Sequence, residues 1–254
     1  MPKRPNPTTN SRQQARDRAR LEAERLQRKR KTTQIIVVVV VALVAISIVA
    51  SAILLGTSGR KDRVPTASTS VTVGGTSVPF DVDGSAFQVG KSDAKATLDL
   101  WVDYSCSHCQ EFEAASNDVL AQKVGSGELK VRYHNLQFVT AYGAQAGSAA
   151  ACVATYAPQQ WWALNAALYA NHSAESDGWK GAQFADFAQQ LGVESQDALT
   201  CIGDQRYTSW ISDNTSAAAD AGVTGTPTLF LNGQQIDTVG GAQLAAKIDE
   251  AASQ

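Results

Sequence analysis

The sequence predicts an α/β domain with a helical insertion, preceded by a single transmembrane helix. Three patterns predict the domain: strand–helix–strand over residues 97–133, an Ala- and Gln-rich helical block over about 141–221, and a closing hairpin and helix over 228–252. A long apolar run ahead of them predicts the membrane helix. With 254 residues, the chain is long enough for one domain with a full core and extra segments.

The first 33 residues form a basic tail. They hold eleven Lys and Arg against three Asp and Glu, a net of +8, whereas the remainder holds eleven against twenty-one, a net of −10. The chain is therefore not a generally basic protein, and we expect no nucleic-acid partner. The tail is expected to set membrane topology and contact anionic headgroups, or simply to remain solvated.

Residues 34–56 are predicted to cross a membrane. Ile35–Leu55 contains fifteen Ile, Val or Leu, four Ala, two Ser and no charge. As a helix it would be roughly 31 Å long, about the thickness of a bilayer core. A buried core helix or strand of this length would show a polar stripe or a turn. The segment Ala50-Ser51-Ala52 resembles a signal-peptidase site, but the long basic segment and long apolar run favour an uncleaved anchor.

The charge asymmetry around this run predicts a single-pass protein of the cell membrane. Lys and Arg resist translocation, so the N-terminus is expected in the cytoplasm and the catalytic domain outside it. That compartment is oxidising and permits disulfides. Residues 57–85, rich in Ser, Thr, Gly and isolated Val, are expected to be a linker that is flexible over Thr57–Gly75, with the folded domain beginning near Ala86.

Inside the domain, the first two strands flank a helix. Thr97–Asp103 alternates and is bulky, as a buried strand is, and Leu129–Tyr133 is typical of a second strand. A helix is expected between them, ending at Lys123. Residues 141–221 then show helical spacing, broken at Pro158, Gly178 and Gly192, which predicts three to five helices.

The end of the chain predicts a hairpin and a helix. Thr228–Leu231 is a strand pattern, and Asn232-Gly233 is a hairpin turn signal because both residues accept positive φ. Gln235–Val239 is expected to return as the partner strand, and Ala242–Ala252 to close the domain as a helix.

Cys106-Ser107-His108-Cys109 is the motif that carries chemistry. Two cysteines at this spacing are a redox pair, half of a zinc site or a structural disulfide, or they occur together by chance. Structural zinc needs four ligands, and the chain has no second Cys-x-x-Cys. We therefore expect no metal site and no cofactor.

The position of the motif favours redox chemistry. Cys106 follows a predicted strand and opens a predicted helix, whose unpaired N–H groups and partial positive charge stabilise a thiolate. Cys106 is then the attacking thiol, and Cys109, one turn on, the resolving one. His108 is expected to favour the Cys106 thiolate by its charge or a hydrogen bond, unless it only faces solvent. Ser107 is expected to have a smaller effect.

The motif and its surroundings resemble the thioredoxin superfamily, and within it the disulfide-bond-formation (DsbA-like) branch. The matching features are strand–Cys-x-x-Cys–helix, a His before the second cysteine, the inserted helical block, and Gly225-Thr226-Pro227-Thr228 before the final hairpin. The resemblance covers roughly residues 86–254. It implies a thioredoxin-like fold, a cis bond before Pro227, and Thr226 facing the disulfide and binding substrate. Ser107 stands where the family more often has Pro or Gly, which leaves the redox potential open.

Three further residues are candidates. Asp103 precedes Cys106 by three positions, and in thioredoxin-like proteins a buried acid beneath the disulfide can relay protons. The alternative is a solvated acid at a helix start. Cys152 and Cys201 are expected to form a structural disulfide, with two buried free thiols or a second redox pair as alternatives.

These features predict a monomeric thiol–disulfide oxidoreductase that oxidises exported unfolded proteins. Re-oxidation would need a membrane partner, which the resemblance implies is a quinone-linked oxidase. The alternatives are an extracytoplasmic reductase or isomerase, and a non-redox binding module or metal chaperone with the same fold.

Overall fold

A computed structural model describes residues 64–253. The basic tail 1–33, the expected transmembrane helix 34–56 and the first part of the expected linker, 57–63, lie outside the described residues. Within 64–253, no helix combines the length and the apolar character needed to cross a bilayer.

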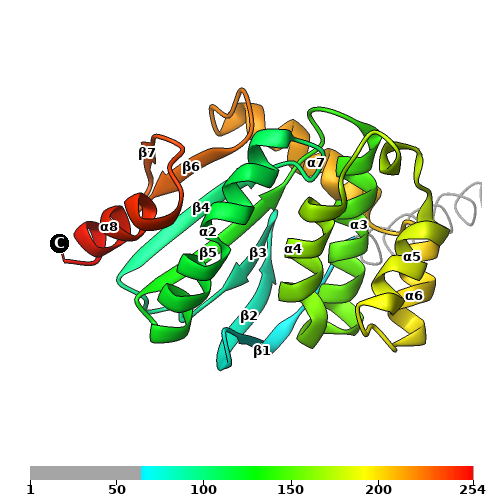
Figure 1. Ribbon diagram of the computed structural model, residues 1–254, viewed down its shortest axis with the longest axis horizontal. Helices are drawn as coiled ribbons and strands as arrows, with labels where there is room; N and C mark the ends of the chain where they lie inside the picture. Colours follow the sequence, from blue (N-terminus) through cyan, green and yellow to red (C-terminus); the bar gives the residue numbers. More distant parts are fainter. Residues whose placement is uncertain (1–63, 254) are drawn as a thin grey trace, which may run out of the picture. The chain divides into compact units, whose positions relative to one another are not determined.

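Residues 64–253 form one mixed sheet with helices on both faces (Figure 1). The strands are β1 Ser68–Val73, β2 Thr76–Asp83, β3 Ala86–Val89, β4 Ala96–Val102, β5 Leu129–Asn135, β6 Thr228–Leu231 and β7 Gln234–Ile236. The α-helices are α2 Ser107–Ser126, α3 Ala141–Tyr156, α4 Trp161–Asn171, α5 Gly181–Gln190, α6 Gln196–Gly203, α7 Thr208–Asp220 and α8 Gly241–Ala252. Two short 3-10 turns, η1 Pro158–Gln160 and η2 Ser176–Gly178, connect helices of the block.

The order of strands in the sheet is β1-β2-β3-β5-β4-β6-β7. β4 and β5 lie at its centre and run parallel, with Leu98 opposite Val131, while the other neighbouring strands are antiparallel. In open α/β sheets, sites form beyond the carboxyl ends of the parallel strands. The segment that follows β4 carries the cysteine motif.

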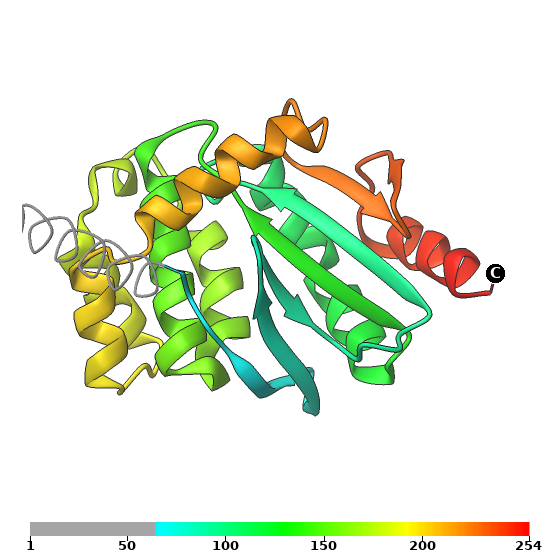
Figure 2. The ribbon, with the colours of Figure 1, turned by 180° about the vertical axis from the view of Figure 1, so that it is seen from behind.

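Alternate residues of β4 pack in two hydrophobic clusters, one on each face of the sheet. Leu98 and Leu100 pack in the main core with Leu244 of α8, and α2 lies against α8 on the same face. Trp101 points the other way and packs with Ala218 of α7 in a smaller cluster. Figure 2 shows α7, in orange, crossing the face of the sheet opposite α2. The sheet is thus covered on both faces, which holds β4 rigidly.

The predicted linker boundary at Ala86 is wrong. Residues 68–83 form the hairpin β1–β2, in which Val71 pairs with Val78 and both side chains are buried. The turn is Gly74-Gly75, with positive φ at both residues. The Ser- and Thr-rich composition suggested a linker, but isolated Val residues at a spacing of two around Gly-Gly form a strand pair with one buried face.

The helical block is confirmed. Residues 141–221, all of which the structure describes, contain five α-helices, α3 to α7. Pro158 opens the 3-10 turn that ends α3, and Gly192, with positive φ, follows α5.

The return strand is shorter than expected, because it ends at Ile236 instead of Val239. Ile236 pairs with Leu229, so Thr238, two positions further on, would lie opposite Pro227, which has no N–H to donate. The segment leaves the sheet there, and Thr238 Oγ1 donates to the Pro227 carbonyl at 3.3 Å instead.

Candidate active site

The cysteine motif lies where β4 gives way to α2. Cys106 is the N-cap of α2, with an extended backbone (φ −88°, ψ 121°), and its carbonyl accepts from the Gln110 N–H at 3.0 Å. No acidic residue occupies the first turn of α2. The partial positive charge of the helix N-terminus therefore acts on the Cys106 sulfur without an acidic side chain in the same turn.

The two thiols have opposite environments. Both are free, but Cys106 is 7% exposed and Cys109 only 1%. The Cys109 thiol donates a hydrogen bond to the Cys106 sulfur, and this is the largest cause of a lowered Cys106 pKa. Hydrogen bonds from the Thr226 side chain and from the N–H groups of Cys109 and His108 lower it further, to about 5. The same hydrogen bond, together with burial, raises the pKa of Cys109. Cys106 is therefore the thiolate and Cys109 the protonated partner, as the sequence predicted.

The loop before β6 faces the pair. The Thr226–Pro227 bond is cis, which confirms the expectation. Cys106 Sγ lies 3.2 Å from the Thr226 carbonyl oxygen, to which it donates when protonated, so the residue before the proline does face the reactive sulfur.

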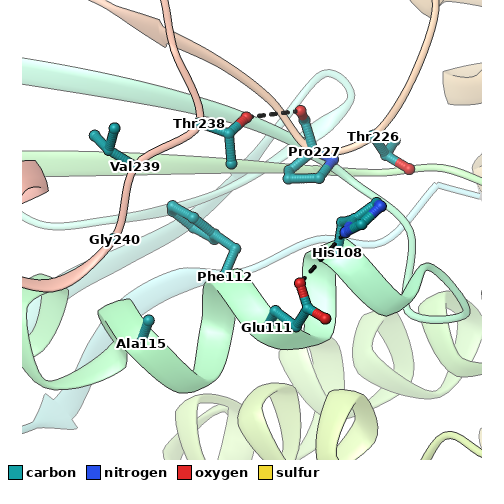
Figure 3. A pocket seen from close by; sticks show the side chains of 9 residues that line it. All are labelled: His108, Glu111, Phe112, Ala115, Thr226, Pro227, Thr238, Val239 and Gly240. Carbon is teal, nitrogen blue, oxygen red and sulfur yellow. Dashed lines mark hydrogen bonds and ion pairs between the residues drawn. The ribbon is translucent and has the colours of Figure 1, made fainter.

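A pocket of about 520 Å³ opens beside this contact. Figure 3 shows Phe112 of α2 below Pro227 and Val239, with the ring of His108 near Thr226. The residues that line it are His108, Glu111, Phe112, Ala115, Thr226, Pro227, Thr238, Val239 and Gly240. Phe112, Ala115, Pro227 and Val239 give it an apolar side next to the loop that contacts Cys106, so it is a candidate groove for a substrate chain.

The expected role of the His108 side chain is corrected. Its ring is exposed and pairs with Glu111, Nδ1 to Oε2 at 3.3 Å, which draws it toward solvent. The contribution of His108 to the Cys106 thiolate comes from its backbone N–H. Ser107 is exposed at the first position of α2.

Asp103 is the buried acid of the two descriptions expected for it. Its carboxylate is fully buried, so it is not a solvated helix-start acid. Oδ1 accepts from Ser105 N at 2.7 Å and Ser105 Oγ at 2.6 Å, while Oδ2 accepts from the N–H of Phe138 at 2.6 Å and of Val139 at 2.9 Å. These four hydrogen bonds stabilise the carboxylate and connect the loop after β4 to the loop after β5. They suit a structural role better than proton transfer.

A second buried acid, Glu113, was missed by the sequence interpretation. Its Oε1 accepts from Asn117 Nδ2 at 2.8 Å and from Asn165 Nδ2 at 3.3 Å, and Asn165 Oδ1 accepts from Tyr104 at 2.7 Å. Burial raises the pKa of Glu113 to about 7. The available signal was its spacing, since a residue four positions after Cys109 shares the inward face of the helix.

Cys152 and Cys201 form the expected disulfide. It joins α3 to α6, with both side chains fully buried in the main core. Among residues 64–253, no group of three or more His, Cys, Asp or Glu side chains is arranged to hold a metal ion.

Known proteins share this architecture. A family model described as Thioredoxin matches residues 83–250. A disulfide bond oxidoreductase (DsbG) from Mycobacterium tuberculosis, solved in its reduced form, is 25% identical, with a TM-score of 0.58 over 67% of this chain and 89% of that one. BdbD from Bacillus subtilis is 16% identical, with a TM-score of 0.59 over 74% and 100% of the two chains. MdbA, a thiol-disulfide oxidoreductase from Corynebacterium matruchotii, is 22% identical, with a TM-score of 0.57 over 70% and 91%.

A curated relative matches this chain over a small part of its own length. The Na(+)/H(+) antiporter NhaA 3 of Salinispora tropica is 27% identical over 158 residues, which are 62% of this chain and 23% of that protein. The chain thus spans under a quarter of the length of the antiporter that it matches.

Proposed function

Because this chain belongs to the thioredoxin family and is a thiol–disulfide oxidoreductase, we propose that it works as an oxidant that introduces disulfides into exported, unfolded proteins. The observation that carries the proposal is the environment of Cys106, whose pKa falls to about 5. A thiol with so low a pKa is a good leaving group, and stabilising the reduced pair makes the disulfide more oxidising.

The reaction consumes two substrate thiols. A substrate thiolate attacks Cys106 Sγ of the oxidised pair, the Cys106–Cys109 bond breaks, and Cys109 leaves with the electron pair and takes up a proton. A second substrate thiolate attacks the substrate sulfur of the mixed disulfide, and Cys106 leaves as the stabilised thiolate. The substrate loses two electrons and two protons, and the enzyme pair is reduced by the same two electrons.

Thr226 and Pro227 are proposed to hold the substrate chain. The Thr226 backbone already faces Cys106 Sγ, so an extended peptide pairing with this loop would bring its cysteine to the reactive sulfur. The neighbouring pocket would take a side chain close to that cysteine.

Glu113 is proposed to exchange the proton of Cys109. Both side chains are buried on the same face of α2, where bulk water does not reach them. Cys109 leaves as a thiolate in a setting that raises its pKa, so it needs a nearby donor. With a pKa of about 7, Glu113 carries a proton for part of the time and can give it up.

The proposed location of the reaction is supported by the sequence outside the described residues. Eleven basic residues before Ile35–Leu55 support a membrane anchor with the catalytic domain on the outer side. The Cys152–Cys201 disulfide agrees with an oxidising compartment. We propose a membrane-embedded, quinone-linked oxidase as the partner that regenerates the Cys106–Cys109 disulfide.

The competing proposal is a reductase or isomerase with the same site. To separate them, the pair is equilibrated with glutathione buffers of known composition, and the reduced fraction is counted by thiol alkylation. An oxidant stays reduced in buffers that oxidise ordinary dithiols, because its potential lies above that of glutathione. A pair that becomes fully oxidised under strongly reducing conditions would make the chain a reductase.

A further inference from the structure

An asparagine from the helical block joins the two sides of the cysteine motif. Asn165 belongs to α4, which packs beside α2 (Figure 1), and its side chain is buried. Its Oδ1 accepts from the Tyr104 hydroxyl at 2.7 Å, and its Nδ2 donates to Glu113 Oε1 at 3.3 Å. Tyr104 lies two positions before Cys106. Glu113 lies four positions after Cys109, so the amide connects residues that flank the motif.

The orientation of this amide is fixed by the acid. An ionised carboxylate can only accept hydrogen bonds, so Asn165 must turn Nδ2 toward Glu113 and Oδ1 toward Tyr104. With a carbonyl oxygen as its partner, the Tyr104 hydroxyl must donate. Burial raises the pKa of Tyr104 well above its usual value, so the hydroxyl keeps its proton throughout the pH range in which Glu113 titrates. The bridge therefore holds the Asn165 amide in one orientation.

The bridge also distinguishes the two oxygens of Glu113. Oε1 accepts from Asn117 Nδ2 at 2.8 Å as well as from Asn165 Nδ2. An amide nitrogen cannot accept a hydrogen bond, so a proton on Oε1 would point at two donors and find no acceptor in them. The proton of a neutral Glu113 therefore belongs on Oε2.

The surroundings of Glu113 leave the amides to set its ionisation. Burial raises the pKa of Glu113, and the hydrogen bonds from Asn117 and Asn165 lower it. Burial also raises the pKa of each nearby tyrosine, so these side chains stay neutral in the same pH range. The titratable groups that face Glu113 are Cys109 on its own helix, Tyr104 after β4, Tyr133 of β5 and Tyr169 of α4.

We propose that Asn165 is the positioning residue for proton exchange at Glu113, because its bridge to Tyr104 reserves Oε2 as the oxygen that carries the proton. This inference rests on the proposed function, in which Glu113 supplies the proton of Cys109. When the Cys106–Cys109 bond breaks, the proton leaves Glu113 Oε2 and joins the Cys109 sulfur. The Asn165 amide then stabilises the carboxylate that remains.

The test follows the ionisation of Glu113 and the reaction in the same variants. In the oxidised protein, carbon-13 NMR of the Glu113 carboxyl carbon gives its pKa, and rapid mixing with glutathione gives the rate of mixed-disulfide formation per glutathione thiolate. Asn165→Leu removes one hydrogen bond to the carboxylate, so the pKa of Glu113 should rise by about one pH unit. The rate should fall where Glu113 loses its proton, so the midpoint of this fall should rise by the same amount.

Gln110→Ala is the matched control, because Gln110 also joins α2 to α4. Its Nε2 donates to the Ala170 carbonyl at 3.5 Å, outside the bridge, so the variant should change neither midpoint. Tyr104→Phe keeps Asn165 but frees its amide to rotate, and it should shift both midpoints in the same direction as Asn165→Leu. In a Glu113→Gln background, Asn165→Leu should leave the rate profile unchanged.

A Glu113 pKa that Asn165→Leu leaves unchanged, or a rate profile that does not follow this pKa, would overturn the positioning role. The role is also wrong if Gln110→Ala gives the same shifts, or if Asn165→Leu has its full effect in the Glu113→Gln background. If Asn165→Leu does not fold, Tyr104→Phe decides by the same criteria. An unsubstituted chain that oxidises no glutathione would instead overturn the proposed function, while the pKa of Glu113 could still be measured.

Discussion

The two cysteine pairs of this domain have opposite surroundings. Cys106 and Cys109 lie at the N-terminus of a helix, are free thiols, and share a hydrogen bond that lowers one pKa and raises the other. Cys152 and Cys201 are fully buried between α3 and α6 and form a disulfide within the main core.

The difference shows that position determines what a cysteine pair does. A helix N-terminus offers N–H groups that stabilise a thiolate, and partial exposure lets a substrate reach it. An apolar interior offers neither, so a pair there joins the elements around it. The predictions below test this contrast, beginning with the larger effect.

Removing the buried disulfide should affect stability and spare the chemistry. In C152A/C201A, the denatured chain regains the freedom of a loop spanning a sequence separation of 49, which corresponds to about 4 kcal/mol of unfolding free energy on the chain-entropy model. Denaturant unfolding measures the loss. Oxidation of glutathione, assayed where the variant is still folded, should keep its rate. A variant of unchanged stability, or a folded one without activity, would show that the two pairs are not independent.

The buried acid should give the domain a distinct pH dependence. Burial raises the pKa of Glu113 from 4.5 to about 7, so the folded state holds this proton more tightly than the unfolded state. The resulting stabilisation is complete below the unfolded pKa and is lost as the pH rises through about 7. In the unsubstituted protein, Glu113 should lower the free energy of unfolding by up to about 3 kcal/mol between acid and mildly alkaline pH. Glu113→Gln should remove this decrease.

This prediction is measured on the oxidised protein, in which Cys106 does not titrate. Glu111→Gln is the control, since Glu111 is exposed on the same helix and pairs with His108. Identical pH profiles for Glu113→Gln and the unsubstituted protein would exclude a raised pKa at Glu113.

Much of this site could be predicted from the order of residues along the chain. A bulky alternating strand followed by Cys-x-x-Cys and a helical pattern located the thiolate, because helix N-termini act through the backbone whatever the side chains are. The Cys152–Cys201 pairing could be predicted because two cysteines remained in a compartment that the sequence predicts to be oxidising. The hairpin β1–β2 was missed because Ser- and Thr-rich strands and linkers have the same composition, and only pairing across Gly74-Gly75 distinguishes them.

The roles of individual side chains were less predictable. Whether His108 points to a sulfur or to Glu111 depends on its rotamer, and in the structure its Nδ1 lies 3.3 Å from Glu111 Oε2. Asp103 and Glu113 are both acids near the motif, yet one accepts four hydrogen bonds from two loops while the other is buried with side-chain amides. Part of each arrangement comes from segments distant in sequence, Phe138 and Val139 for Asp103 and Asn165 for Glu113, and local patterns do not contain those contacts.

The central claim is that Cys106 is a stabilised thiolate, and its ionisation can be measured directly. Thiolate absorbance of the reduced protein is followed with pH in the unsubstituted chain, in Cys106→Ser and in Cys109→Ser. One cysteine should ionise with a pKa of about 5, and this transition should disappear in Cys106→Ser but persist in Cys109→Ser. A first ionisation near 8.5, the ordinary value for cysteine, or a transition that survives in Cys106→Ser, would contradict the account.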